Sequence, residues 1–332
     1  MRLSVLDLSP VPAGSTPAQA LANTLDLARH AEAIGMHRYW LAEHHNAASV
    51  ASSSPQVMIA AVASATKRIR VGSGGVMLPN HSALVVAEAF RVLHALHPGR
   101  IDLGVGRAPG TDPKTALALR RSRELLGAEG FPEQLDELLR LLTHDPDPNV
   151  PFNAIKAVPT GVPPPEVWLL GSGGDGATLA ARRGLGFAFA HHFDPSATIP
   201  SLAIYRDGFR APPWNAEPQV IVATAAICGD DDAHADRLAS SGELAWLRFG
   251  QGVRDLPLPT PEEALAYAWD EVEEQHRAAT RGRQIRGGPA RVADALRALA
   301  ESTGASELMI TTHVHDHEER KRSYARIVRA LA

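Results

Sequence analysis

Residues 39–46, "YWLAEHHN", end a short apolar run abruptly in a carboxylate and two adjacent imidazoles. The same ending returns in residues 187–193, "FAFAHHF". One sequence that ends two apolar runs in the same way indicates that both segments have the same place in one architecture. The fold therefore has to be predicted before either motif is assigned a chemistry.

Working outward from this stretch, short apolar runs alternate with amphipathic helical patterns along most of the chain. The predicted strands are residues 3–8, 38–42, 70–74, 101–105, 166–170, 185–190, 220–227 and 307–311. Predicted helices lie at 17–34, 55–65, 84–96, 132–142, 177–183, 199–209 and 318–331. Because parallel neighbours need a crossover connection, this alternation indicates parallel strands. Eight strand candidates predict an α/β fold, a closed (β/α)₈ TIM barrel rather than an open doubly wound sheet.

Residues 229–288 are rich in charge and glycine and are too long for a plain connection. We expect them to form an insertion between the seventh and eighth strands, with a helix of its own around residues 262–276. The rest of the chain forms the barrel, so we expect a single domain over residues 1–332.

Composition excludes several classes of function. The formal net charge of −4 gives no electrostatic footprint for nucleic acid or an anionic membrane. Cys228 is the only cysteine, so neither an intrachain disulfide nor a cysteine-based zinc site is possible, which fits a reducing cytoplasm. The amino-terminal residues do not have the pattern of a signal peptide, and no apolar run approaches the roughly 20 residues of a membrane span. We expect a cytoplasmic protein.

Barrel geometry explains the repeated ending, because active sites in this fold lie at the carboxyl ends of the strands. Three glycine-rich segments, 73–75, 104–107 and 171–174, end strands in the same way as the two histidine motifs. The segment 171–174, "GSGG", offers backbone N–H groups and a hydroxyl at a helix start, and Arg107 adds a fixed cation. A plain loop and a surface ion pair are the alternatives, but two anion-binding features at one end favour a phosphorylated ligand.

Metal binding is the weaker interpretation of the histidines. Adjacent strand residues point to opposite faces, so His44 and His45 do not easily serve one ion. His44 with His191 or His192 would still lack the third protein ligand that a catalytic zinc usually has.

A second histidine-rich segment, residues 312–320 ("THVHDHEER"), would place His313, His315 and His317 on one face if extended. It leads directly into a helix start whose acidic residues suit the helix dipole, so solvated histidines are the simpler interpretation. We expect no metal site in either place.

Five ordered motifs resemble those of the bacterial luciferase-like flavin-dependent monooxygenases. They are "WLAEHHN" (40–46), "VGSGGVMLPNHSALVVAEAF" (71–90), "HPGRIDLGVGRAPG" (97–110), "WLLGSGGDGATLAARRG" (168–184) and "FAFAHHFDP" (187–195). The likeness is closest to the single-polypeptide group of luciferase-like oxidoreductases. It is weakest in the insertion, where such enzymes vary their substrate lid.

The resemblance implies a barrel that binds reduced FMN at the carboxyl ends of its strands, with His44 as the catalytic imidazole and His45 as structural support. It implies a non-proline cis peptide between Gly74 and Gly75. Two positions differ from luciferase itself, which has a bulky aromatic residue at His191 and a reactive cysteine at Gly106. The implied cofactor-binding residues are Glu43, Gly74, Gly75, Arg107, Gly171, Ser172, Gly173 and His191, and either Glu43 or a backbone carbonyl would fix the tautomer of His44.

The implied reaction is that of a two-component monooxygenase. Reduced FMN, supplied by a separate flavin reductase, reacts with O₂ to a C4a-(hydro)peroxide that oxygenates a small organic substrate. A homodimer is expected. The alternatives are an F420-dependent oxidoreductase on the same barrel, a non-catalytic flavin-binding protein, and a metal-dependent hydrolase barrel.

Overall fold

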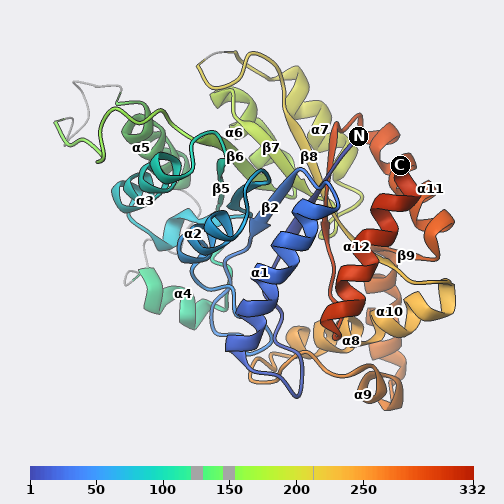
Figure 1. The fold of residues 1–332 in the computed structure, drawn as a ribbon. Helices are drawn as coiled ribbons and strands as arrows, with labels where there is room; N and C mark the ends of the chain where they lie inside the picture. Colours follow the sequence, from blue (N-terminus) through green and yellow to red (C-terminus); the bar gives the residue numbers. More distant parts are fainter. Residues whose placement is uncertain (121–129, 145–153, 212) are drawn as a thin grey trace.

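A computed structural model describes residues 1–120, 130–144, 154–211 and 213–332. Its centre is a closed barrel in which each strand is parallel to its neighbours, and β8–β10 and β10–β1 pairing closes the ring (Figure 1). The barrel strands are β1 (Arg2–Asp7), β2 (Arg38–Leu41), β3 (Arg70–Ser73), β5 (Ile101–Gly106), β6 (Glu166–Gly171), β7 (Gly186–Ala190), β8 (Val220–Cys228) and β10 (Glu307–Thr311). The predicted (β/α)₈ fold is confirmed.

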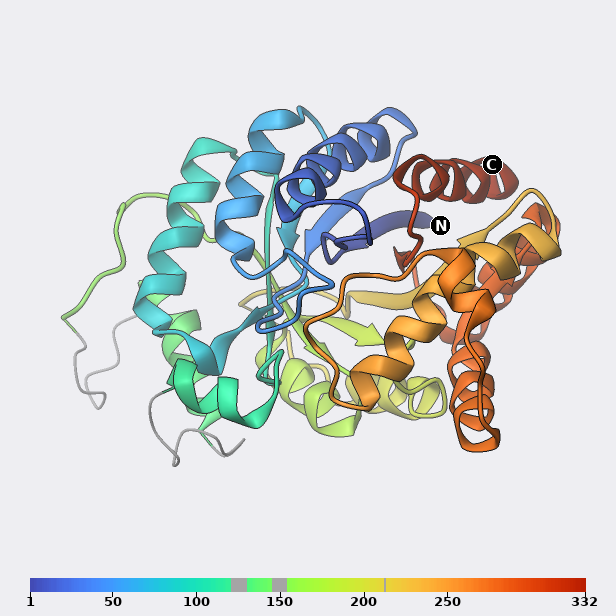
Figure 2. The ribbon, with the colours of Figure 1, turned by 90° about the horizontal axis from the view of Figure 1, so that it is seen from below.

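A ring of helices surrounds the barrel, and the two chain termini lie near each other because β1 pairs with β10 (Figures 1 and 2). The ring consists of α1 (Pro17–Ala33), α2 (Pro55–Ala65), α3 (Ala83–Leu96), α5 (Phe131–Thr143), α6 (Gly174–Arg183), α7 (Thr198–Asp207), α11 (Pro289–Thr303) and α12 (His317–Leu331). Caps define several starts: the Thr16 hydroxyl accepts from the Gln19 N–H before α1, and Asp316 accepts from the Glu319 N–H before α12. Within the described ranges, no helix is both long enough and apolar enough to cross a membrane.

Three short elements extend this plan at the carboxyl ends of the strands. Strand β4 (Val76–Met77) continues the third barrel strand and pairs with β5. The 3₁₀ helix η1 (Leu78–Asn80) follows it, and α4 (Pro113–Arg120) lies in the connection after β5. None was predicted, because segments this short carry no readable hydrophobic period.

The insertion lies between β8 and β10, as predicted, but its contents differ from the prediction. It holds α8 (Asp232–Gly250), α9 (Pro261–Ala266), α10 (Glu271–Gly282) and strand β9 (Gln284–Gly287), which pairs with β8. The single helix expected around 262–276 is wrong. Tyr267 is extended after α9, and Asp270 with Glu273 forms a capping box that starts α10 anew.

Inward-facing residues fill the barrel in layers, because alternate residues of each strand point inward. At the amino-terminal end the layer is ionic, with Arg38, Asp102 and Glu307 buried and Glu166 half-exposed. Arg38 lies 2.8 Å from Asp102, 3.0 Å from Glu307 and 3.1 Å from Glu166, and Arg70 also pairs with Asp102 and Glu166. The next layer is apolar and includes Trp40 and Trp168, whose rings meet edge to face at 5.9 Å.

The layer nearest the carboxyl ends is built from small residues, namely Ala42, Gly74, Gly106 and Ala190. A Cβ on Gly74 would lie 2.6 Å from the Leu6 side chain, so a larger residue there would displace Leu6. Small residues at this level leave a flat floor at the mouth of the barrel, and the polar ends of the strands surround it.

Candidate active site

His44 lies two residues beyond Ala42, so alternation turns its imidazole toward the mouth of the barrel. Its Nδ1 is 3.3 Å from the Gly110 carbonyl oxygen, and its backbone N–H donates to the Ser52 carbonyl at 2.8 Å. A carbonyl only accepts, so Nδ1 carries the proton and donates it, which leaves the Nε2 lone pair free. Burial lowers the pKa of His44 and keeps the ring neutral. Of the two orienting groups considered from the sequence, the backbone carbonyl is the one in contact.

Gly110 is fixed in turn by its own backbone. Its φ is +65°, and a Cβ would lie 2.6 Å from the Glu43 carbonyl oxygen, so only glycine fits this position without displacement. The same Gly110 carbonyl accepts from the His45 backbone N–H at 3.2 Å. The connection after β5 therefore sets the orientation of the imidazole that follows β2.

Glu43 is fully buried behind His44. Its carboxylate accepts from His81 at 2.9 Å, from the His45 Nε2 at 3.0 Å, from the Met77 backbone N–H at 3.0 Å and from the Asn80 amide at 3.3 Å. Burial alone would raise the pKa of Glu43, but these hydrogen bonds, led by those from His81 and His45, hold it below its usual value. Glu43 thus joins the β2 and β4 loops, and direct contact with a cofactor stays a prediction.

Two further imidazoles share the mouth with His44, and neither was among the predicted site residues. His192 follows β7 and donates from Nδ1 to the Ala223 carbonyl at 3.0 Å, which leaves its Nε2 free as in His44. His313 follows β10, and burial, with the nearby charge of Arg320, lowers its pKa to about 4. The site therefore holds three neutral imidazoles from three strands.

Alternation was the signal that could have identified both residues. Counting in twos from Ala188 leads inward through Ala190 to His192, and counting from Met309 leads to His313. His191, which was predicted as the cofactor contact after β7, has its Nδ1 2.8 Å from the Thr198 hydroxyl at the start of α7. Its role toward a cofactor stays a prediction.

The floor below these imidazoles contains the Gly74–Gly75 peptide, which is cis, as the resemblance implies. A Cβ on Gly75 would lie 2.9 Å from the Gly104 carbonyl oxygen, and one on Gly104 would lie 2.1 Å from the Ser73 carbonyl oxygen. Backbone packing this close excludes side chains from both positions. Backbone that carries no side chains is a surface on which a flat ring can lie closely.

The anion-binding features predicted at this end lie near each other. Helix α6 begins after Gly171, Ser172 and Gly173, and its N-cap, Gly173, has no side-chain oxygen to satisfy the first N–H groups. The half-exposed Arg107 guanidinium lies 3.8 Å from Asp175 in the first turn of this helix. An exposed pair at that distance is weak and leaves Arg107 available to an anion. Uncapped N–H groups beside a guanidinium suit a phosphate group.

Metal ligation finds no support in the mouth. Among the described residues, the one group of three side chains close enough to hold an ion is Asp26, His317 and Glu318, between α1 and α12. The Lys321 ammonium already lies 2.8 Å from Asp26 and 3.0 Å from Glu318. His315 contacts a backbone carbonyl of the β1 loop instead. The three histidines of segment 312–320 therefore contact separate partners.

The insertion crosses the mouth and contacts several barrel loops. Gly242 of α8 packs against His313, where a Cβ would lie 3.3 Å from that residue. The Ala48 N–H of the β2 loop donates to the Arg254 carbonyl at 2.7 Å, and the Leu258 N–H donates to the Val11 carbonyl at 2.8 Å. Helices α8 and α9 lie at the lower end of the molecule in Figure 1, opposite the amino terminus. The role of the insertion as a substrate lid stays a prediction.

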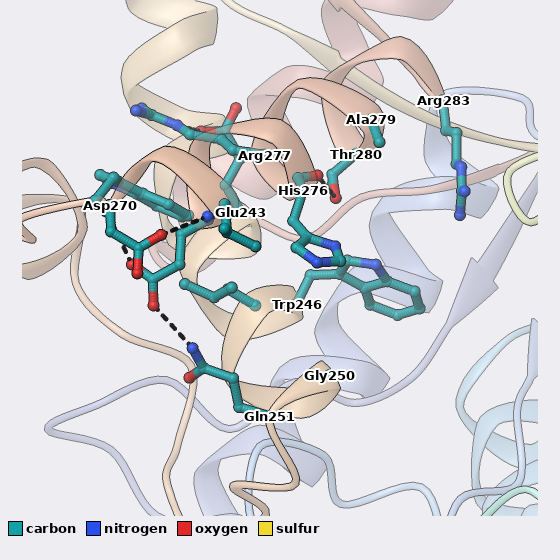
Figure 3. A pocket seen from close by; sticks show the side chains of 14 residues that line it. Glu243, Trp246, Gly250, Gln251, Asp270, His276, Arg277, Ala279, Thr280 and Arg283 are labelled. Carbon is teal, nitrogen blue, oxygen red and sulfur yellow. Dashed lines mark hydrogen bonds and ion pairs between the residues drawn. The ribbon is translucent and has the colours of Figure 1, made fainter.

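A cavity of about 380 Å³ lies within the insertion, between α8 and α10 (Figure 3). At one end, the buried Glu243 is bound by Arg277 at 2.6 Å and Arg281 at 2.8 Å, and Arg286 also contacts it. Trp246 lies toward the other end. The carboxylate of Glu243 is thus fully paired within the protein, and these ion pairs hold α8, α10 and β9 together.

Comparison with known proteins identifies relatives along nearly the whole chain. Residues 1–320 match the sequence model of the luciferase-like monooxygenase family. The uncharacterized protein YvbT of Bacillus subtilis is 46% identical over 97% of this chain and 94% of its own length. A luciferase-like monooxygenase of Escherichia coli is 40% identical over 97% and 94%. The crystal structure of apo-MsnO8 superposes with a TM-score of 0.89 at 37% identity, covering 99% of this chain and 98% of that one.

Proposed function

Since this chain belongs to the luciferase-like monooxygenase family, we propose that it is a flavin-dependent monooxygenase that uses reduced FMN and O₂ to oxygenate a small organic substrate. The observation that carries the proposal is the state of His44. Its proton is held on Nδ1 by the Gly110 carbonyl, which leaves Nε2 free, and the neighbouring strand ends at Gly75 and Gly104 have no room for side chains. A positioned neutral imidazole beside a flat binding surface suits the proton transfer that oxygenation requires.

The residues present fit FMN in two respects. Gly74, Gly75 and Gly104 admit no side chain, so a flat isoalloxazine ring can lie against the backbone. The uncapped start of α6, with Arg107 beside it, suits the phosphate. When bound, reduced FMN supplies the two electrons with which one oxygen atom of O₂ enters the substrate and the other becomes water.

The protein's own contribution is to hold a proton acceptor and to exclude water. His44 accepts a proton at Nε2 and returns it, while the Gly110 carbonyl keeps the ring in one orientation. His192 and His313, held neutral by burial, place no competing charge beside it. The insertion covers the mouth through contacts with the β1, β2 and β10 loops, which limits access of water.

The proposal includes a separate reductase that supplies reduced FMN, and a place in the cytoplasm where such a reductase would act. The described residues form the barrel, its helices and the insertion, and we assign reduction of the flavin to a second protein. Adding a flavin reductase and NADH should replace chemically reduced FMN in the assay below.

A homodimer is also proposed, formed by α2 and α3. Val85, Val92 and Leu96 lie on one side of α3, and Val57 lies on the neighbouring α2; all four side chains are between 46% and 68% exposed. Exposed apolar side chains gathered on two packed helices suit contact with a second copy. Light scattering should give the mass of a dimer, and Val92→Glu should give a monomer. A monomeric wild type would contradict this part of the proposal.

The test of function begins with anaerobic titration of the purified protein with reduced FMN and, separately, with reduced F420. Oxygen is then admitted with a panel of small sulfides, ketones and aldehydes, and products are measured by mass spectrometry. We expect FMN to bind and at least one compound to gain a single oxygen atom. Binding of F420 alone would establish the hydride-transfer alternative. Flavin binding with no turnover would establish a non-catalytic flavoprotein, and zinc-dependent hydrolysis would establish the metal-dependent alternative.

A further inference from the structure

Three large aromatic side chains at the mouth are unusually exposed. Phe193, Trp246 and Phe249 are 48%, 45% and 43% exposed, although burial of such side chains normally stabilises a fold. The Trp246 and Phe249 rings stack at 5.7 Å with 17° between their planes, and the Phe193 and Trp246 rings stack at 6.5 Å with 28°. These three residues, the aromatic row, form one apolar surface that joins the β7 loop to α8.

Each end of the aromatic row meets a different kind of side chain. At the inner end, the Phe193 ring lies 4.4 Å from the His192 ring, which belongs to the imidazoles of the site. At the outer end, the Arg254 guanidinium carbon lies 4.4 Å from the centre of the Phe249 ring. The row therefore leads without interruption from a fixed cation to the reacting centre.

Arg254 is the unusual member of this arrangement. In the described part of the chain its side chain has no hydrogen bond and no ion pair, and its Nη1 is buried without a partner. Its position is nevertheless fixed, because the Arg254 carbonyl accepts from the Ala48 N–H and the guanidinium rests on Phe249. The Arg254 Nε and Nη2 also have no partner among the described residues and, unlike Nη1, are not buried. A carboxylate is the anion whose two oxygens best match a guanidinium, and these are the nitrogens that it can reach.

We propose that Arg254 and the aromatic row bind the substrate, and that the substrate is an elongated organic acid. Its carboxylate pairs with Arg254, its apolar body lies along Phe249 and Trp246, and its reacting end passes Phe193 to reach His192. Each step along the row is between 4.4 and 6.5 Å, so a molecule that spans it needs several rings or a long chain. That the bound acid is the substrate rests on the proposed monooxygenase function.

The neighbouring cavity offers a matched control. Its charged end is closed by Glu243 and the arginines that bind it, but Arg283 lies near Trp246 at the other end (Figure 3). Arg283 is exposed, forms no ion pair within the described residues, and does not contact the aromatic row by stacking. It therefore has the charge of Arg254 without its position.

The test measures binding to the full chain without flavin, by titration calorimetry. The probes are biphenyl-4-carboxylate and its neutral analogue biphenyl-4-carboxamide. We expect the wild type to bind the carboxylate roughly tenfold or more tightly than the amide, as a charge-assisted pair implies. Arg254→Gln should remove that preference while leaving amide binding unchanged, Arg254→Lys should keep part of it, and Arg283→Gln should keep all of it. Trp246→Ala should weaken binding of both probes.

Equal binding of the two probes by the wild type would overturn the inference, as would an unchanged preference in Arg254→Gln or its loss in Arg283→Gln. Circular dichroism and the melting temperature of each variant exclude misfolding as the cause. A second measurement separates this inference from the proposed function. If the wild type binds both probes equally but oxygenates a substrate normally, only the organic-acid site is contradicted. An intact preference without any oxygenation supports the acid site and counts against the monooxygenase.

Discussion

The two ends of the barrel treat ionisable side chains in opposite ways. At the amino-terminal end, Arg38 and Arg70 are charged and paired with Asp102, Glu166 and Glu307 at hydrogen-bond distance. At the carboxyl-terminal end, three imidazoles are held neutral by burial, with free nitrogens. The eight strands thus carry paired charges at their amino-terminal ends and imidazoles with a free nitrogen at their carboxyl-terminal ends.

This difference indicates where stability and activity reside. Removal of either partner from a buried ion pair strongly destabilises the fold, because the remaining charge is left without compensation. A neutral imidazole with one nitrogen free contributes less to folding than a buried ion pair, but its free nitrogen is available to a ligand or a proton. We therefore expect substitutions at the amino-terminal end to change the free energy of unfolding, and substitutions at the mouth to change turnover.

The largest effect is expected from His44→Ala. Loss of a positioned acid–base group lowers turnover by roughly 10²- to 10⁴-fold, whereas FMN affinity and the melting temperature should change little. Steady-state kinetics at saturating reduced FMN measures the effect, together with the hydrogen peroxide released. His37→Ala, at the opposite end of the barrel, serves as control and should retain activity. Normal turnover by His44→Ala would remove the distinction between the two ends.

Asp102→Asn tests the other end. The substitution removes the negative charge that pairs with both Arg38, at 2.8 Å, and Arg70. The free energy of unfolding should therefore fall by about 3 kcal/mol. Urea denaturation measures this fall. Turnover per folded molecule should remain that of the wild type. A stable variant with impaired turnover would show that the ionic layer acts on the chemistry.

The contrast also shows how far the sequence predicts this molecule. All eight barrel strands were predicted, because each has an apolar run of strand length between helical patterns. The rim was predicted for the same reason, since polar groups directly after those runs have to lie at one end of a parallel barrel. His44 and Arg107 follow from that rule together with the resemblance.

What remained unpredicted depends on contacts between distant segments. The place of His192 beside the mouth depends on a turn after β7, in which His192 bonds to a carbonyl of β8. His313 was assigned to a solvated segment because its environment comes from α8, more than sixty residues earlier in the chain. The break between α9 and α10 depends on a capping box at Asp270 that competes with a continuous helix.

Arg107→Ala gives a smaller effect, confined to the mouth. If the guanidinium binds the FMN phosphate, its loss should weaken FMN binding roughly 10- to 100-fold, the scale of a charge-assisted hydrogen bond. Fluorescence titration with FMN measures this change. Asp175→Asn is the matched control, because it removes the carboxylate 3.8 Å from Arg107 and should leave affinity equal or higher. Unchanged affinity in Arg107→Ala would place the phosphate elsewhere.

The smallest expected effect concerns the pH dependence of stability. Burial lowers the pKa of His313 from its usual 6.5 to about 4. Between pH 6.5 and pH 4, His313 is therefore protonated in the unfolded chain but stays neutral in the folded protein. It does not lower the free energy of unfolding above pH 6.5, and it lowers it increasingly as the pH falls to about 4. At pH 5 the penalty should be about 1–2 kcal/mol.

His313→Gln isolates this penalty, because glutamine has no proton to bind and is of similar size. Urea denaturation at pH 7.5 and pH 5 gives the free energy of unfolding of both proteins, and the loss on acidification should be smaller in the variant by about 1–2 kcal/mol. Arg38 and Asp102 at the other end are present in both proteins, so their response to acid cancels in the difference. An equal loss in the two proteins would mean that His313 takes up its proton in the folded state as readily as in the unfolded chain. The mouth would then hold a charged imidazole beside His44, and the contrast between a neutral and an ionic end of the barrel would fail at that residue.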